Sequence, residues 1–258
     1  MRAVSDSTDM QRNIRLILEY DGTDFKGWQV QPDQRTVQGE LEACLHRLFG
    51  TPIRTIAAGR TDTGVHALGQ VANFITVNPL NVEHIQNALN SMLPADSAVR
   101  HAHEVPLRFH ARRDARRREY VYRIEYGRRA IGRQYALCIR SRLDLEAMQD
   151  AAARLLGHHD FTSFCVAASE RENLECHLFE STWQQSEDGV HFRIAANRFL
   201  RTMVRSIVGT LIQVGRGGRS ADDVTKILEA RDRRCAGPSA PPHGLFLKRV
   251  TYEDLPGG

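Results

Sequence analysis

The sequence contains no stretch of about 18 consecutive apolar residues, which is the length that a membrane-spanning helix needs. Its first residues, MRAVSDSTDMQRN, are polar and lack the apolar centre of a signal peptide. The five cysteines are scattered and odd in number, with no CxxC spacing, which argues against a disulfide framework and a structural zinc site. We therefore expect an intracellular, cytoplasmic protein with reduced cysteines.

Cofactor signatures are also missing. The glycine cluster GRGG at 215–218 follows an expected helix instead of preceding one, so it does not form a phosphate-binding loop. Neither HExxH nor a two-histidine-and-carboxylate pattern occurs. We expect no metal and no cofactor. One alternative stays open, a metal-dependent phosphoesterase that uses His101, His103 or Asp160.

Basic residues gather in one region of the chain. The whole sequence carries 35 basic and 31 acidic residues, and its net charge of +4 says little about partners. Between residues 108 and 133, however, ten arginines stand against three acidic residues. Arginine pairs bidentately with phosphate and stacks on bases, and aromatic residues are interleaved here. The run predicts a nucleic-acid surface; the alternative is a solvated linker and strand edge. The arginines are Arg108, Arg112, Arg113, Arg116, Arg117, Arg118, Arg123, Arg128, Arg129 and Arg133.

Hydrophobic periodicity predicts strands and helices in mixed order. The 258 residues are 41% hydrophobic, enough to form a core in one large domain or two small ones. Period-two alternation or apolar runs predict strands at 14–20, 66–77, 98–105, 118–127 and 244–254, and a hairpin over 177–197. Helical spacing and caps predict helices at 37–49, 82–92, 144–157, 199–215 and 221–230.

This order of elements predicts an α+β protein. We expect two similar halves, each a mainly antiparallel sheet with helices packed on one face. The halves should span residues 13–107 and 108–252, with flexible tails at 1–12 and 253–258.

The segment AAGRTDTGVHALGQVANF, residues 57–74, is the sharpest candidate for a site. Gly59 and Gly64 bound a short polar loop that contains Arg60 and Asp62, and glycines allow another molecule to approach the backbone closely. Aspartate is also a common turn former. The neighbouring arginine favours the catalytic interpretation, because a cation stabilises a charged carboxylate that can act as a nucleophile.

Seven motifs in order resemble those of the tRNA pseudouridine synthase A family. They are EYDGTDFKGWQVQP with TVQGELEACL, AAGRTDTGVHALGQVANF, RFHARRDARRREYVYRI, DFTSFC, NRFLRTMVRSIVGTLIQVG and APPHGLFLKRVTY. Together they extend from about Ile14 to Tyr252. Any one of them could be chance, but the ordered set is highly specific.

The resemblance implies two α+β halves that meet at a basic cleft, a homodimer, and cofactor-free isomerisation of uridine to pseudouridine in the tRNA anticodon arm, at positions 38, 39 and 40. Asp62 matches the catalytic aspartate that attacks the target nucleoside, and Arg60 matches the arginine beside it. Tyr120 matches the tyrosine that stacks against the target base, and Arg205 an arginine that pairs with the catalytic carboxylate. We also expect substrate contacts from His66, Arg112, Arg116, Arg117 and Arg118.

The chain departs from the family pattern at Thr63, Asp114, Cys176 and His177. None of these residues touches the expected chemistry, so they put RNA contacts in doubt more than the type of reaction. A further alternative is a non-catalytic RNA-binding protein that keeps the fold and binds RNA through its arginine-rich surface.

Overall fold

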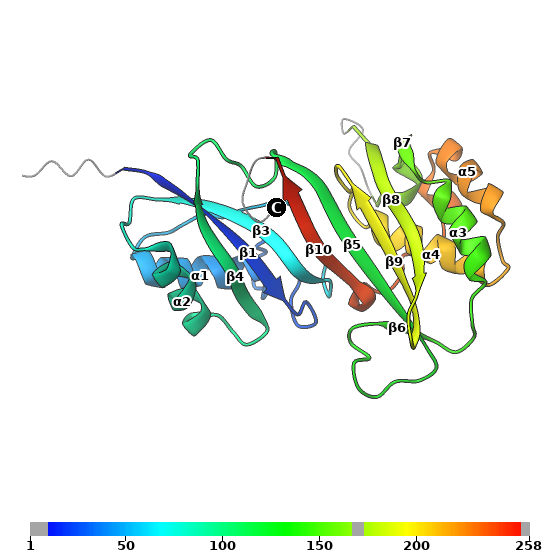
Figure 1. Cartoon of the computed structure of the whole chain (residues 1–258), viewed down its shortest axis with the longest axis horizontal. Coiled ribbons are helices and arrows are strands. Elements are labelled where there is room, and N and C mark those ends of the chain that lie inside the picture. The colour runs from blue at the N-terminus through cyan, green and yellow to red at the C-terminus, as the bar shows by residue number, and fades with distance from the viewer. Residues whose placement is uncertain (1–9, 167–172, 254–258) are drawn as a thin grey trace, which may run out of the picture.

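The computed structural model describes residues 10–166 and 173–253, and its strands form one sheet (Figure 1). The strand order is β4-β1-β3-β10-β5-β9-β8-β7, with β2 paired to β3 and β6 paired to β5. Neighbouring strands are antiparallel except for β3 with β10 and β5 with β6. The strands are β1 (Arg12–Tyr20), β2 (Ile56–Ala57), β3 (His66–Thr76), β4 (Ser97–Val105), β5 (Ala115–Tyr126), β6 (Leu137–Ile139), β7 (Gly157–Asp160), β8 (Glu175–Gln185), β9 (Gly189–Ala196) and β10 (Leu245–Tyr252).

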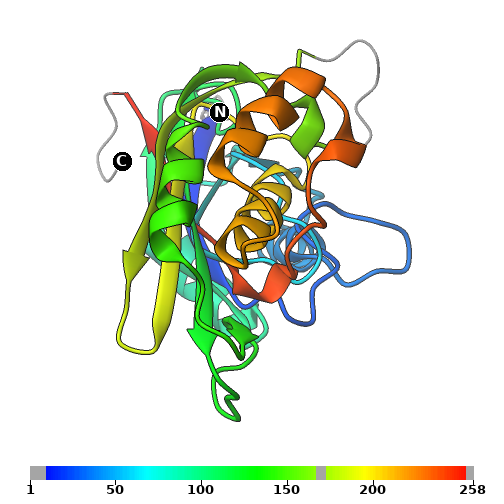
Figure 2. The same cartoon turned by 90° about the vertical axis from the view of Figure 1, so that its right-hand side faces the viewer.

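The five α-helices in the described part of the chain begin and end mostly where capping residues predict. Thr36 caps α1 by accepting a hydrogen bond from the Gly39 N–H at 3.2 Å, and Ser220 and Asp223 form a capping box at the start of α5. In Figure 2, α1, α4 and α5 lie on one side of the sheet. The helices are α1 (Val37–Phe49), α2 (Val82–Met92), α3 (Leu145–Ala153), α4 (Met203–Gly215) and α5 (Ala221–Ala230), and short 3₁₀ turns occupy Thr162–Phe164, Arg233–Cys235 and Pro242–Gly244.

The α+β class and the mainly antiparallel sheet expected from the sequence are confirmed. Strand β10 comes from the end of the chain yet lies between β3 of the first half and β5 of the second (Figure 1). Its parallel pairing with β3 is short, joining Phe246 to His66 and Leu247 to Ala67. The two halves therefore share one sheet. The domain limits 13–107 and 108–252 stay a prediction, and the expected tails fall largely on residues 1–9 and 254–258, outside the described residues.

Helix α4 is the most deeply buried helix of those described. Eleven of its thirteen residues are buried, and the two that are not are Arg205 and Gln213. Close approach to the neighbouring segment requires a glycine here, because a Cβ at Gly209 would lie 1.7 Å from the carbonyl oxygen of Pro238. A charged residue in such a helix needs a partner, so we expect Arg205 to form an ion pair or hydrogen bonds.

Some boundaries differ from the sequence-based prediction. Helix α4 begins at Met203 and not at Phe199, because Thr202 adopts a left-handed conformation with φ of 61° that helical residues cannot share. Helix α3 ends at Ala153, and the GHHD segment beyond it forms the edge strand β7. Among the residues that the structure describes, no helix is long and apolar enough to cross a membrane.

Candidate active site

Asp62 lies in the loop that joins β2 to β3, and hydrogen bonds fix this loop on both sides of it. The Trp28 N–H donates to the Thr61 carbonyl oxygen at 3.1 Å, and the Tyr20 and Thr61 hydroxyls are 2.8 Å apart. Gly64 has a φ of 76°, so a side chain there would be strained. The glycines of the GRTDTG segment thus permit a tight loop whose backbone is held in place.

The carboxylate of Asp62 pairs with Arg205 from α4. Arg205 Nη1 donates to Asp62 Oδ2 at 3.2 Å, and the two side chains are 19% and 27% exposed. The same guanidinium donates from Nε to the Ala240 carbonyl oxygen at 2.8 Å. The pair joins residues that are 143 positions apart in the chain, and it leaves the carboxylate open to a ligand.

Arg60 is exposed, and it has no hydrogen bond or ion pair to any residue in the described part of the chain. The sequence suggested that Arg60 would stabilise the Asp62 carboxylate, but the arginine that pairs with that carboxylate is Arg205. Arg60 is therefore free to contact a substrate that approaches the loop.

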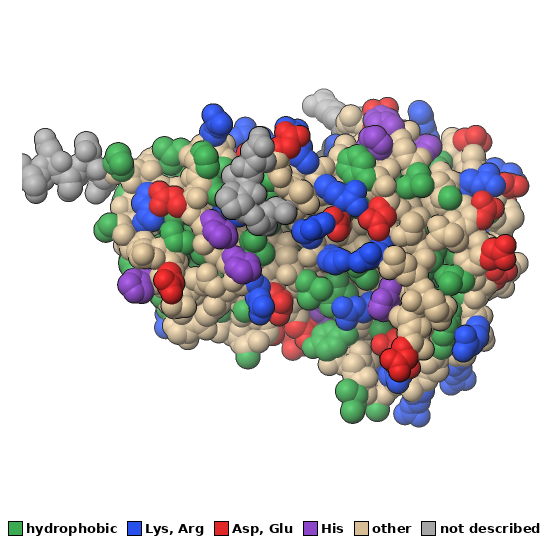
Figure 3. All heavy atoms as spheres, in the orientation of Figure 1, with side chains coloured by type: hydrophobic (Ala, Val, Ile, Leu, Met, Phe, Trp, Pro, Cys, Tyr) green, Lys and Arg blue, Asp and Glu red, His purple; other side chains and the backbone are tan. Residues whose placement is uncertain are grey.

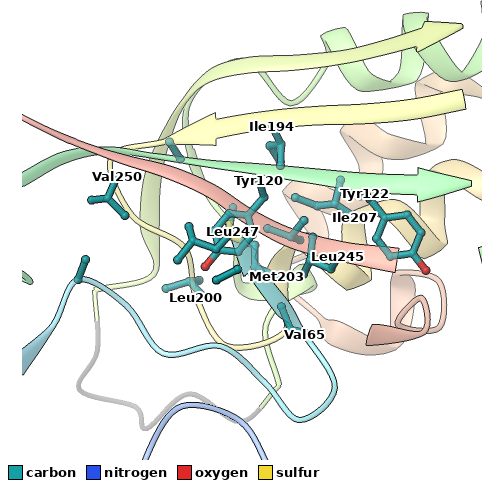
Figure 4. Packing of buried hydrophobic residues seen from close by; sticks show 14 of the residues in the cluster. Val65, Tyr120, Tyr122, Ile194, Leu200, Met203, Ile207, Leu245, Leu247 and Val250 are labelled. Carbon is teal, nitrogen blue, oxygen red and sulfur yellow. The ribbon is translucent and has the colours of Figure 1, made fainter. Parts of the chain in front are cut away.

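Tyr120, from β5, lies on the helix-covered side of the sheet near this pair. Its ring meets Phe199 edge-on, with the centroids 5.1 Å apart, and Figure 4 shows it among Leu200, Met203 and Leu247. Its hydroxyl makes no hydrogen bond to a described residue. Burial raises the pKa of Tyr120 above its usual range, and nearby Tyr20 and Asp62 raise it further against the opposing effect of Arg118.

Arg118 is on the same side of β5 as Tyr120, but its guanidinium is enclosed by protein. The residue is 8% exposed and donates only to backbone carbonyl oxygens. Burial lowers the pKa of Arg118. Its sequence neighbour Arg117 points to the other face of the sheet, because successive strand residues alternate.

Arg117 belongs to a network of mixed charge on the helix-free face. It pairs with Glu119 at 3.1 Å and with Glu180 at 2.7 Å, and Arg249 also pairs with Glu119. Basic and acidic side chains are interleaved over β10 and β5 in Figure 3. The structure thus does not bring Arg117 together with Asp62.

Two other arginines of the basic run are exposed. Arg112 makes no side-chain hydrogen bond to a described residue, and Arg116 pairs with Glu253 at 3.1 Å with its side chain 62% exposed. Asp114, which interrupts the run, has a local structural role, since its carboxylate accepts a hydrogen bond from the His110 N–H at 2.8 Å.

His66 is 1% exposed, so contact with a substrate would require it to leave its present position. Its Nδ1 lies 3.0 Å from the Gly22 N and 3.1 Å from Asp21 Oδ1, and its Nε2 lies near the carbonyl oxygens of Gln134 and His243. Burial lowers the pKa of His66, and the Asp21 carboxylate partly offsets that effect. His66 therefore joins segments of both halves as a neutral ring.

The residues of the metal-dependent alternative lie far apart. His101 and His103 stack on β4, with centroids 6.2 Å apart, whereas Asp160 is on β7 at the opposite edge of the sheet. Across the described ranges, no three His, Cys, Asp or Glu side chains cluster in a way that could hold a metal ion. These three residues do not form one site.

Two exposed arginines in the segment that leads to Arg205 were missed by the sequence reasoning. Arg198 and Arg201 lie in the segment that connects β9 to α4, just before Arg205. The signal was present in NRFLRTMVR, where arginines interrupt an apolar stripe at intervals of three and four residues.

Comparisons with known proteins agree with this arrangement. The family model described as tRNA pseudouridine synthase matches residues 16–114 and 151–253. A protein of Exiguobacterium sp. named tRNA pseudouridine synthase A is 47% identical over 244 residues, which cover 95% of this chain and 99% of the relative. Its namesake of Halalkalibacterium halodurans is 49% identical over 241 residues, covering 92% of each chain. Another, of Moorella thermoacetica, is 46% identical over 244 residues, covering 93% of this chain and 99% of the relative. With matches of this extent across both halves and the loop of Asp62, the chain belongs to the tRNA pseudouridine synthase family.

Proposed function

We propose that this protein isomerises uridine to pseudouridine in tRNA and that Asp62 is its nucleophile. The observation that carries the proposal is the Asp62–Arg205 pair at 3.2 Å, in a rigid loop near the ring of Tyr120. A carboxylate held by an arginine is available in its charged form, which is the form that attacks carbon. Membership of the family supplies the reaction and the class of substrate.

The reaction needs no external reactant, because uridine and pseudouridine are isomers. The bond from the ribose C1′ to N1 of uracil breaks, the base turns, and a bond from C1′ to C5 forms. C5 loses its proton and N1 gains one, so atoms and electrons balance within the nucleotide. The protein has to provide a nucleophile, hold the detached base and keep it from escaping.

The side chains around Asp62 suit these tasks. Tyr120 offers an aromatic surface for an unstacked base, and its hydroxyl has no protein partner to give up. Arg60, two residues before Asp62, is exposed, as are Arg198 and Arg201 in the segment that leads to α4, and all three can contact backbone phosphates. Arg112 and Arg116 extend this set along the basic run.

The test is tritium release from tRNA labelled at uracil C5, with no metal or cofactor added. We expect wild-type protein to release tritium and Asp62→Asn to be slower by at least ~10³-fold, because the nucleophile is gone. Asp222→Asn is the matched control: Asp222 is 70% exposed and lies on α5, so release should match the wild type. Binding of tRNA by Asp62→Asn should persist.

An active Asp62→Asn protein would remove Asp62 from its role. If the wild-type protein binds tRNA in a salt-sensitive way but releases no tritium, the non-catalytic RNA-binding function is the correct one.

Three finer proposals follow from the family resemblance. The target uridines are those at positions 38, 39 and 40 of the anticodon arm, which tRNAs with one of these uridines replaced can test. The protein acts as a homodimer, which sedimentation equilibrium can test, and it acts in the cytoplasm, where its substrate is found.

A further inference from the structure

Arg118 uses every donor of its guanidinium within the protein. An arginine side chain has five N–H donors. Nε and Nη2 donate to the Ala58 carbonyl oxygen at 3.2 and 2.8 Å, and Nη2 also donates to the Arg112 carbonyl oxygen at 2.8 Å. Nη1 donates to the carbonyl oxygens of Ala115 at 3.3 Å and Asn197 at 2.5 Å. These five hydrogen bonds leave none for a phosphate.

The carbonyl partners of Arg118 lie at the roots of the two segments that carry the ion pair. Ala58 comes four residues before Asp62, at the start of the catalytic loop. Asn197 comes eight residues before Arg205, where β9 ends and the connection to α4 begins. One planar group thus sets the separation of two segments that meet again at the active site.

Apart from Arg118 and the Asp62–Arg205 pair itself, the residues that hold the catalytic loop by hydrogen bonds come from the first half of the chain. Gln70 donates to the Gly59 carbonyl oxygen at 2.9 Å, the Tyr20 and Thr61 hydroxyls are hydrogen-bonded, and the Trp28 N–H donates to the Thr61 carbonyl oxygen. Arg118, on β5 of the second half, is thus a second guanidinium, beside that of Arg205, that ties the loop to the second half. Without the hydrogen bonds of Arg118, the relative position of Asp62 and Arg205 would be less well fixed.

We propose that Arg118 is a positioning residue, which fixes the loop of Asp62 relative to the segment of Arg205, and that it does not bind tRNA. The catalytic part of this proposal rests on the proposed function of Asp62. It replaces the expectation, drawn from the arginine-rich sequence, that Arg118 contacts the substrate. Burial supports it, since the residue is 8% exposed.

Substitutions of Arg118 distinguish a positioning role from a phosphate contact. Arg118→Lys keeps the charge but cannot span the four carbonyl groups with a planar fork. A positioning role predicts that kcat falls by about 10- to 100-fold, with KM for tRNA and the salt dependence of binding unchanged. A phosphate contact predicts a nearly wild-type Lys variant, and an Arg118→Met variant whose salt slope falls by about 0.7 to 0.9. Arg112→Met, at an exposed arginine, is the comparison that should show such a fall.

A double-mutant cycle with Arg205→Lys distinguishes positioning from general destabilisation. If Arg118 acts through the Asp62–Arg205 pair, the two substitutions together lower kcat by less than the product of their separate effects. Effects that multiply would overturn the proposal, as would a wild-type kcat for Arg118→Lys or a reduced salt slope for Arg118→Met.

Amide hydrogen exchange tests whether Arg118 holds the two segments together, and it does not depend on catalysis. In Arg118→Lys, amides of residues 58–65 and 197–205 should exchange faster than in the wild type, while those of α2 should not change. Unchanged exchange in both segments would overturn the proposal. If the wild-type protein formed no pseudouridine, the proposed function of Asp62 would be refuted. Hydrogen exchange would still decide whether Arg118 holds the loop.

Discussion

Tyr120 and Tyr122 allow a sharp test of which hydroxyl serves the reaction and which serves the fold. Both lie on the same face of β5, two residues apart, and both are buried. The Tyr122 hydroxyl donates to the Pro241 carbonyl oxygen at 2.8 Å, whereas the Tyr120 hydroxyl has no partner in the described part of the chain. Replacement by phenylalanine removes one oxygen atom in each case, so the two variants form a matched pair.

The structure predicts that Tyr122→Phe mainly lowers stability and that Tyr120→Phe mainly lowers kcat. Tyr122→Phe breaks a hydrogen bond and leaves the Pro241 carbonyl oxygen unpaired, which costs about 1–2 kcal/mol of the free energy of unfolding. Tyr120→Phe breaks none, so its stability should stay within about 0.5 kcal/mol of the wild type. A hydroxyl kept without a partner next to a nucleophile indicates use in the reaction, so kcat of Tyr120→Phe should fall by about 10²- to 10⁴-fold.

The direction of the Tyr120 pKa restricts what that hydroxyl can do. Because its pKa is raised, Tyr120 is protonated at neutral pH and can donate a hydrogen bond or a proton, but it is not present as phenolate before substrate binds. Urea denaturation would measure stability, and single-turnover tritium release would measure the chemical step. A Tyr120→Phe variant with wild-type rates, or one destabilised as much as Tyr122→Phe, would refute this reasoning.

Three further predictions concern the charge, the pH dependence and the packing. Arg112→Met should lower the salt dependence of tRNA binding, whereas Arg117→Met should not, since Arg117 lies on the helix-free face of the sheet. Binding titrations at several salt concentrations would measure both slopes, and equal slopes for the two variants would show that tRNA does not bind where we expect. Burial raises the pKa of four tyrosines above the unfolded value near 10, so these tyrosines contribute fully to the free energy of unfolding below pH ~10. As the pH rises above ~10, we expect the free energy of unfolding to fall by up to ~1.4 kcal/mol per pH unit for each tyrosine. Urea midpoints that stay constant to pH ~11.5 would contradict this. Gly209→Ala should cost about 1–3 kcal/mol or more because its Cβ would lie 1.7 Å from the Pro238 carbonyl oxygen, and a denaturation curve like that of the wild type would show that this contact can relax. The four tyrosines are Tyr20, Tyr120, Tyr122 and Tyr252.

Local patterns predicted the long elements of this fold well. The caps at Thr36 and Asn81 and the capping box at Ser220 are visible in the sequence because each depends on residues three positions apart or fewer. The short strands β6 and β7 were missed, since three or four residues are too few to show alternation. The position of β10 between β3 and β5 could not be predicted either, because no local pattern encodes which strands become neighbours.

The candidate site was predicted in part. The sequence singled out Asp62, Tyr120 and Arg205, and the structure brings all three to one side of the sheet, while their catalytic roles stay predictions. It grouped Arg117 with Arg118 by composition, although strand alternation sends the two side chains to opposite faces. Counting in steps of two from Tyr120 would have separated them. Burial of the Arg118 guanidinium depends on carbonyl groups from two distant segments, at Ala58 and Asn197, and on that of nearby Arg112, which composition does not reveal.

The place of β10 in the sheet also has a consequence for biosynthesis. Among the described strands, β10 is translated last, yet it is the strand that joins β3 to β5. While the nascent chain emerges from the ribosome, the parts of β3 and β5 that pair with β10 stay unpaired, and such edges are prone to mispairing with other chains. The loop of Asp62 leads into β3, whereas Arg205 lies on α4 of the second half, and β10 is the strand that joins β3 to β5 in one sheet. A partly synthesised chain without β10 therefore holds both residues of the pair without the sheet that fixes the two halves relative to each other.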